Sequence, residues 1–169
     1  MIERNVKYMN IASFLMPKSM VTYVYDDFSL RQAYEKMTYH GRTEVPVITR
    51  ENEYVGTLRE GDLLRYLTGH MKKSDKNQKT LDVRDFESVF VREILCRATN
   101  PPVCINTGYG ELIERSITQN FIPVIDDRNS FIGIVTKTSV MKQLALDLKQ
   151  VQYEKLFGVQ TDMNCIKVN

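Results

Sequence analysis

An internal repeat constrains this chain more than any other feature of its sequence. Residues 46–67 (PVITRENEYVGTLREGDLLRYL) align with residues 123–144 (PVIDDRNSFIGIVTKTSVMKQL) without a gap, at a constant offset of 77. Six of these 22 aligned pairs are identical, and six more are conservative replacements. Upstream, 11–16 (IASFLM) resembles 91–96 (VREILC) at an offset of 80. The sequence therefore predicts two copies of one unit of about 55 residues, the second about three residues shorter.

Within one unit, the pattern predicts the order β-α-β-β-α, which places the chain in the α/β (α+β) class. In the first copy, Ser29 and Gln32 have the spacing of a capping box, so a helix should begin there. Gly41 suits the end of that helix. The expected strands are 21–25, 45–48 and 54–58, and the second helix is expected over 62–67.

The repeat also divides the chain into parts. The linker contains the polar, non-periodic run GHMKKSDKNQKT, so an exposed loop is expected there. After the second copy the last helix should continue, because an apolar stripe runs through Val140, Leu144, Leu148 and Val151. The expected parts are a first repeat at 1–67 with its core at 11–67, a charged linker at 68–88, a second repeat at 89–148, and a helical extension and tail at 149–169.

Composition argues against several kinds of site. The net charge of +2 gives no support to a nucleic-acid partner. The two histidines and three cysteines are scattered, with no CxxC pair, so neither a metal site nor a catalytic pair is expected. An odd number of unpaired cysteines fits a reducing compartment, and no apolar run is long enough to span a membrane. We therefore expect a cytoplasmic protein.

The two units together resemble a tandem CBS-domain pair, or Bateman module. The resemblance rests on a helix, a PV(I/V) strand, a polar turn, a glycine after an apolar pair, and a following helix led by Asp or Ser in each unit. It extends from Ile11 to about Leu148. It implies two repeats related by a pseudo-two-fold axis, clefts between them that bind adenosine-type ligands, a regulatory role without catalysis, and a homodimer.

The cleft motif of this family is roughly G-h-h-[ST]-x-x-[DN]. Its glycine lets the backbone approach a ligand closely, its hydroxyl and the helix N-terminus suit a phosphate, and its carboxylate can accept hydrogen bonds from ribose. The first copy, Gly56 to Asp62, keeps the acid but has Arg59 at the hydroxyl position. Arg59 is either a forked phosphate donor or a solvated surface arginine.

The second copy departs from the motif in the opposite way. Between Gly133 and Ser139 it keeps the hydroxyl residue, Thr136, and has a serine at the position of the acid. Lys137 is adjacent and can add positive charge for a phosphate. Each cleft therefore retains one half of the expected anchor.

The resemblance further implies composite clefts, in which the motif of one repeat faces the base-holding residues of the other. The Thr136/Ser139 cleft would be completed by Thr22, Arg42, Thr43 and Glu44. The Arg59/Asp62 cleft would be completed by Val103, Asn120 and Phe121.

Each candidate also has a purely structural interpretation. Asp62 suits the first turn of a helix because of the helix dipole, and Thr136 suits an N-cap. Phe121 precedes a buried strand and can belong to the core.

Two functions stay open at this point. The first is a sensor of an adenosine-containing nucleotide (AMP, ADP, ATP or cyclic di-AMP) that signals to an unknown partner protein in trans. The second is an interaction or dimerisation module with degenerate clefts that binds no nucleotide.

Overall fold

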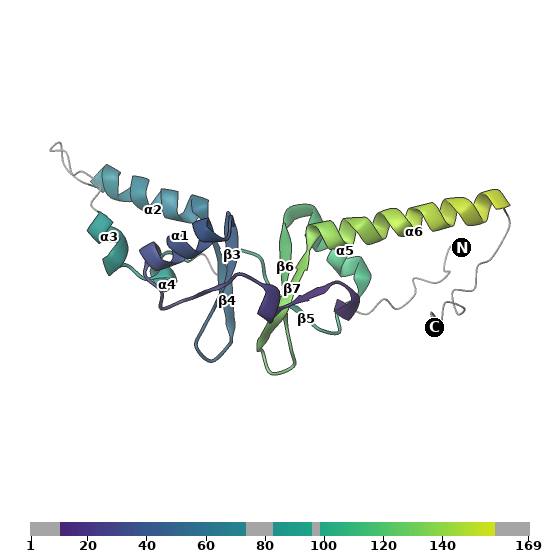
Figure 1. The fold of residues 1–169 in the computed structure, drawn as a ribbon, viewed down its shortest axis with the longest axis horizontal. Helices are drawn as coiled ribbons and strands as arrows, with labels where there is room; N and C mark the ends of the chain where they lie inside the picture. The colour runs from purple at the N-terminus through teal and green to yellow at the C-terminus, as the bar shows by residue number, and fades with distance from the viewer. Residues whose placement is uncertain (1–10, 74–82, 96–98, 158–169) are drawn as a thin grey trace.

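The computed structural model describes residues 11–73, 83–95 and 99–157 (Figure 1). Two short 3-10 turns, Ile11–Ser13 and Lys18–Met20, flank the first strand. The strands are β1 (Leu15–Pro17), β2 (Val24–Tyr25), β3 (Glu44–Ile48), β4 (Tyr54–Arg59), β5 (Val103–Cys104), β6 (Phe121–Ile125) and β7 (Phe131–Thr136). The helices are α1 (Leu30–Tyr39), α2 (Glu60–Lys73), α3 (Val83–Ser88), α4 (Val91–Ile94), α5 (Tyr109–Thr118) and α6 (Lys137–Phe157).

The strands form two small sheets with matching topology. One sheet has the order β2-β3-β4 and the other the order β1-β7-β6-β5. In each, a parallel pair (β2 with β3, β5 with β6) is followed by an antiparallel pair (β3 with β4, β6 with β7). Figure 1 shows the two sheets side by side in the middle, with helices covering their outer faces. This confirms the predicted β-α-β-β-α order of both copies.

Local signals placed the first helix correctly. Ser29 Oγ accepts from Gln32 N at 3.2 Å, and Gln32 Oε1 accepts from Ser29 N at 3.0 Å, so the capping box is complete. The helix is followed by Gly41, whose φ of 60° lies in the left-handed region that glycine adopts easily.

The segments that lead into the two copies are exchanged between them. β1, which leads into the first copy, pairs antiparallel with β7 of the second, with Leu15 opposite Val135. Ile11 is fully buried in the second copy's core, whereas Val91, at the start of α4, is fully buried in the first copy's core. The similarity between 11–16 and 91–96 thus reflects two equivalent segments, each packed on the other copy.

The linker differs from the expected exposed loop. α2 continues beyond Leu67 to Lys73, and α3 occupies Val83–Ser88. Phe86 of α3 packs against the first core, so part of this segment is folded onto the repeat. Residues 74–82 lie outside the described residues.

A third apolar cluster joins the two copies. Ile48 of β3 and Phe131 of β7 are almost fully buried within it, together with Val21, Phe121 and Ile134. The hairpin turns meet at the same place, where Phe131 N donates to Asn52 O at 2.8 Å. The described halves therefore form one packed body.

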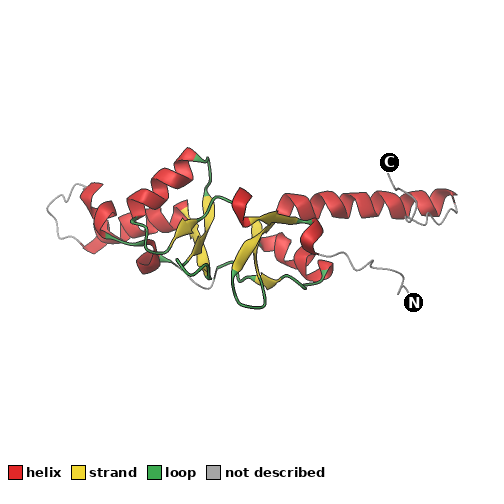
Figure 2. Cartoon of the chain, turned by 60° about the horizontal axis from the view of Figure 1, so that its bottom comes forward, coloured by secondary structure: helices red, strands yellow, loops and turns green. Residues whose placement is uncertain are grey.

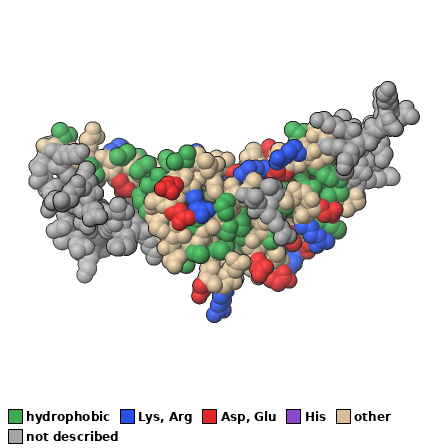
Figure 3. Space-filling view, turned by 180° about the vertical axis from the view of Figure 1, so that it is seen from behind, with side chains coloured by type: hydrophobic (Ala, Val, Ile, Leu, Met, Phe, Trp, Pro, Cys, Tyr) green, Lys and Arg blue, Asp and Glu red, His purple; other side chains and the backbone are tan. Residues whose placement is uncertain are grey.

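α6 projects away from this body (Figures 1 and 2). Its expected apolar stripe begins at the buried Val140, but Leu148 is 63% exposed and Val151 is 47% exposed. Charged side chains of both signs are mixed with hydrophobic ones on the face shown in Figure 3, and Lys and Arg do not gather in one patch there. Among the described helices, none is long and apolar enough to cross a membrane.

Gly133→Ala should destabilise the fold strongly, because a Cβ at this position would lie 2.2 Å from Met16 O on the neighbouring β1 backbone. Overpacking of this kind costs about 2 kcal/mol or more. For a chain of this length we expect a fall in Tm of roughly 5 °C, measured by circular dichroism.

Gly61→Ala is the matched control, since a Cβ there has open space and Gly61 lies within α2. Alanine is favoured over glycine in a helix by about 1 kcal/mol, so this variant should be as stable as the wild type or more so. Equal Tm values for the two variants would contradict the packing of β1 against β7.

Candidate functional site

The two motif segments occupy equivalent places, where the last strand of each copy passes into its last helix. Glu60, the first residue of α2, donates its N–H to Thr43 O at 3.0 Å. Lys137, the first residue of α6, donates its N–H to Asn120 O at 2.9 Å. At the start of each of these helices, one backbone N–H is therefore already bonded within the chain.

The motif glycines make room for the exchanged segments rather than for a ligand. A Cβ on Gly56 would lie 3.0 Å from Leu95 Cδ2, and a Cβ on Gly133 would lie against Met16 O and Leu15. Leu15 and Leu95 correspond to each other in the repeat. The expected close approach is present, but the neighbour is the protein's own chain.

Arg59 is not a solvated surface residue. Its side chain is 37% exposed, and Nε lies 3.3 Å from Glu44 Oε2, whose own side chain is only 13% exposed. Its Nη2 donates to Asn100 Oδ1 at 2.9 Å. Arg59 thus joins the β3–β4 hairpin to the segment that precedes β5.

Asn100 anchors that segment through a second contact. It is 4% exposed and has a φ of 55°, a left-handed conformation that asparagine tolerates. Its carbonyl accepts from Tyr54 Oη at 2.8 Å, and Thr57 Oγ1 lies 2.9 Å from the same phenol oxygen. Burial raises the pKa of Tyr54 to about 12, although the Thr57 hydrogen bond and the Arg59 charge oppose the rise.

Asp62 is a buried carboxylate at the start of α2, with 7% of its surface exposed. Its Oδ2 accepts from Arg59 N at 2.9 Å, so it satisfies a free donor of the helix N-terminus. Its Oδ1 accepts from the guanidinium of Arg65, one turn further along the helix. Asp62 thus stands in the first turn of α2, where its structural interpretation places it, and it also lines a cavity.

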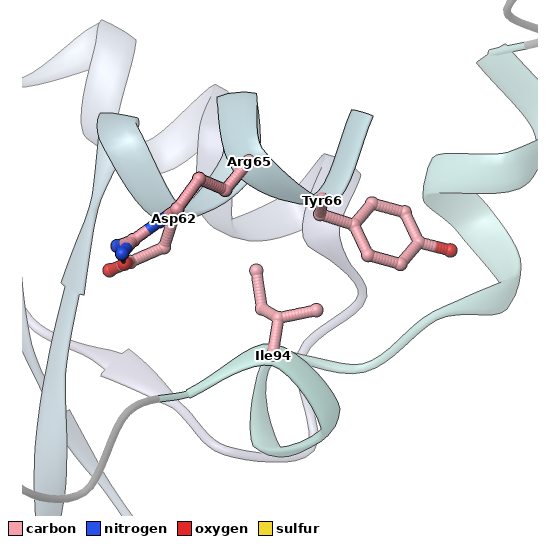
Figure 4. Close-up of a pocket in the computed structure, with 4 residues that line it drawn as sticks. All are labelled: Asp62, Arg65, Tyr66 and Ile94. Atoms are coloured by element: carbon pink, nitrogen blue, oxygen red, sulfur yellow. Dashed lines mark hydrogen bonds and ion pairs between the residues drawn. The ribbon is translucent and has the colours of Figure 1, made fainter. Parts of the chain in front are cut away.

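That cavity has a volume of about 340 Å³ and is lined by Asp62, Arg65, Tyr66 and Ile94 (Figure 4). Ile94 belongs to α4, so the cavity lies between α2 and the exchanged segment of the second copy. Figure 4 shows Ile94 beneath α2, with the Asp62–Arg65 pair on one side and the Tyr66 ring on the other. The volume falls within the range of small-ligand sites.

The second copy's hydroxyls are used within the chain. Thr136 Oγ1 accepts from Ser139 N at 3.1 Å, as an N-cap does, and Ser139 Oγ donates to Thr136 O at 2.7 Å. Lys137 Nζ lies 3.4 Å from Ile117 O, so this cation points to the last turn of α5. Thr136 therefore caps α6, and a serine, Ser139, stands at the position where the motif has an acid.

Glu44 is grouped differently from the expected composite cleft. In the antiparallel β3–β4 pair Glu44 lies opposite Arg59, and in the β6–β7 pair Phe121 lies opposite Thr136. Strand register therefore places each residue beside the motif of its own copy, while Phe121 also packs with Ile48 of the first copy in the cluster that joins the two.

The remaining predicted residues lie around these two hairpins. Val103 is 3% exposed and belongs to the second core, and Phe121 is 6% exposed in the cluster that joins the copies. Arg42 and Thr43 are exposed before β3, Asn120 is exposed before β6, and Thr22 is half-buried before β2.

Sequence reasoning missed the residues that complete the first site. Arg65 stands three residues after Asp62, which is the spacing of a helical ion pair. Ile94 lies in the segment 91–96, which the offset of 80 relates to 11–16. The exchange of these segments brings it to the first copy, and no other sequence signal marks it. Tyr66, Tyr54 and Asn100 carry no signal that links them in the sequence. Among the described residues no group of three or more His, Cys, Asp or Glu could hold a metal ion.

Comparison with known proteins finds a family with this arrangement. The CBS domain model matches residues 12–69 and 91–146. An uncharacterized protein of Methanocaldococcus jannaschii, MJ1426, is 22% identical over 152 residues, which cover 77% of this chain and 88% of that protein.

Two solved structures show the same fold. CbpB in complex with c-di-AMP superposes with a TM-score of 0.73 at 23% identity, over 87% of this chain and 91% of that chain. CBSX2 in complex with AMP superposes with a TM-score of 0.63 at 22% identity, over 83% and 98%.

Tyr54→Phe should change the alkaline pH dependence of stability. A phenol with a folded pKa of about 12 and an unfolded pKa of about 10 binds its proton more tightly in the native state. Its contribution is complete below pH 10 and is lost as the pH rises toward 12. The gap in unfolding free energy between the wild type and Tyr54→Phe should therefore shrink by about 1 kcal/mol between pH 9 and 11.

Urea denaturation at each pH measures this gap. Tyr34→Phe is the control, because Tyr34 is 49% exposed. A gap that stays constant with pH for Tyr54→Phe would show that the phenol is not buried as described.

Proposed function

We propose that this chain, which belongs to the CBS domain family, is a non-catalytic regulatory module that binds an adenosine-containing nucleotide. The observation that carries the proposal is a buried carboxylate, Asp62, held at a helix N-terminus and lining a cavity of about 340 Å³ between α2 and α4. Two proteins of the same fold were solved with c-di-AMP and with AMP, which supports this ligand class.

The residues of the cavity suit the parts of such a ligand. Asp62 would accept hydrogen bonds from ribose hydroxyls, and the Tyr66 ring and Ile94 offer apolar surface for a base. The guanidinium group of Arg65, which also lines the cavity, is a forked donor of the kind that phosphate oxygens accept, and Arg59 lies on the strand that leads into α2. We propose AMP, ADP, ATP or cyclic di-AMP as ligands, with the occupied state sensed by a partner protein.

Buried polar atoms near Arg59 support a ligand in this region. Glu44 Oε1 and Asn100 Nδ2 are buried and make no hydrogen bond within the part of the chain that the structure describes. An acceptor and a donor left over in one place would complement a polar ligand edge.

The second site should bind more weakly. At Thr136 and Ser139 the hydroxyls already bond to the chain, and a serine offers ribose a weaker acceptor than a carboxylate. A ligand there would depend on the helix N-terminus and on Lys137, with Asn120 and Phe121 beside them and Thr22, Arg42 and Thr43 as the more distant candidates.

A dimerisation role is the second candidate function, and the projecting part of α6 favours it. Several apolar side chains there are at least 47% exposed, which is more than a monomer usually shows on one helix. They are Leu146, Leu148, Val151, Tyr153 and Leu156. We propose a homodimer that covers them, in a cytoplasmic protein.

Asp62→Asn should weaken AMP binding by at least tenfold, measured by isothermal titration calorimetry. A charge-assisted hydrogen bond is worth about 1.5–3 kcal/mol, and the amide keeps the size of the side chain. Asp127→Asn, at an exposed turn residue, is the control and should bind as the wild type does.

Thr136→Ala should have a smaller effect on AMP than Asp62→Asn. If Asp62→Asn leaves the affinity unchanged and Thr136→Ala removes it, then the second site is the main one and our ranking is wrong.

A double substitution, Leu148→Lys with Val151→Lys, should convert a dimer to a monomer without unfolding it, because both side chains are solvent-exposed within one chain. Light scattering with size-exclusion chromatography measures the mass. A wild-type mass near 20 kDa at every concentration tested would refute the homodimer.

A further inference from the structure

We infer that Arg65 makes the Asp62 site selective for phosphorylated nucleotides over nucleosides, because only a phosphate compensates Arg65 for the contact with Asp62 that ribose takes. The inference rests on the proposed function and concerns the same cavity. Arg65 and Asp62 form an ion pair, and their two side chains differ sharply in solvent exposure.

Asp62 is the fixed partner. Its side chain is 7% exposed, and Oδ2 is held by the backbone N–H of Arg59 at 2.9 Å. This bond sets the carboxylate at the cavity wall whether or not a ligand is bound. The other oxygen, Oδ1, has no backbone donor, and we assign it as the acceptor for a ribose hydroxyl.

Arg65 is the movable partner. Its side chain is 75% exposed, and its Nη2 donates to Asp62 Oδ1. Most of the Arg65 side chain lies in solvent, and a long, flexible side chain on a helix surface can turn to another partner. Arg65 therefore competes for the oxygen assigned to ribose, beside the cavity that both residues line.

Exchange of partners has opposite consequences for two kinds of ligand. A nucleoside that bonds to Asp62 Oδ1 displaces the guanidinium and gives it nothing in return. A nucleotide displaces it equally, but supplies phosphate oxygens that the freed guanidinium can take as a forked pair. The ion pair thus disfavours nucleosides, and the phosphate compensates for its loss.

Arg59, at the hydroxyl position of the motif, is less suited to this exchange of partners. Arg59 is already engaged by Glu44 at 3.3 Å and by Asn100 at 2.9 Å, so it is less free to follow a ligand. Arg65, in contrast, pairs with Asp62, which is the proposed ribose acceptor.

Calorimetry with two probes, AMP and adenosine, tests the inference on the wild type and on Arg65→Gln. The wild type should prefer AMP by at least tenfold. Arg65→Gln should lose about tenfold in AMP affinity and should bind adenosine as well as the wild type or better, because Asp62 is then free. Arg65→Lys keeps the charge without the fork and should fall between the two.

Arg31→Gln is the control for lost charge, since Arg31 is an exposed arginine that pairs with Glu35 and Glu87 on the outer helices. It should keep the wild-type preference. Equal losses of AMP and adenosine affinity in Arg65→Gln, or no loss in either, would overturn the inference. Failure of the proposed function has a different signature, because the wild type would then bind neither probe, and the inference would fall with it.

Discussion

The antiparallel contact between β1 and β7 is the interaction on which the rest of this structure depends. The backbone of β1 passes so close to Gly133 that no side chain fits between Met16 O and that residue. The contact places Ile11 and Phe14 in the core of the second copy. Its counterpart, α4, places Val91 and Ile94 against the first copy. Neither core is complete with the residues of one copy alone.

This exchange also builds the candidate site. The cavity at Asp62 is closed by Ile94, and the Arg59 cluster is closed by Asn100, and both residues come from the segment that leads into the second copy. A ligand in the first copy's site would therefore contact a segment whose continuation, β5, belongs to the other sheet. Through this segment, ligand binding at the first copy can change how the two copies are arranged relative to each other.

Much of the fold was predictable because its signals are local. The gapless alignment of 46–67 with 123–144 and the capping box at Ser29 fixed the element order. Apolar periodicity does not say which sheet a strand joins, so the exchange of β1 could not be predicted. The end of α2 was missed because residues 68–73 have no apolar periodicity and include Gly69, which has a low helix propensity.

The site was predictable in part for the same reason. Asp62 and Thr136 stand where the repeat placed them, at helix starts. Glu44 was assigned to the other copy's cleft, but antiparallel register sets it opposite Arg59. Arg65 was missed although its spacing of three residues from Asp62 is that of a helical ion pair. Asn100 was missed because its contact with Arg59 depends on a chain crossing that leaves no motif.

The central claim is that a nucleotide binds between α2 and α4, and an NMR titration of the ¹⁵N-labelled chain with AMP tests it most directly. We expect the amide signals of Asp62, Arg65, Tyr66 and Ile94 to shift together and to saturate with one binding curve. Signals that stay in place throughout the titration, or shifts centred on Thr136 to Ser139 with the α2 amides unchanged, would contradict the account.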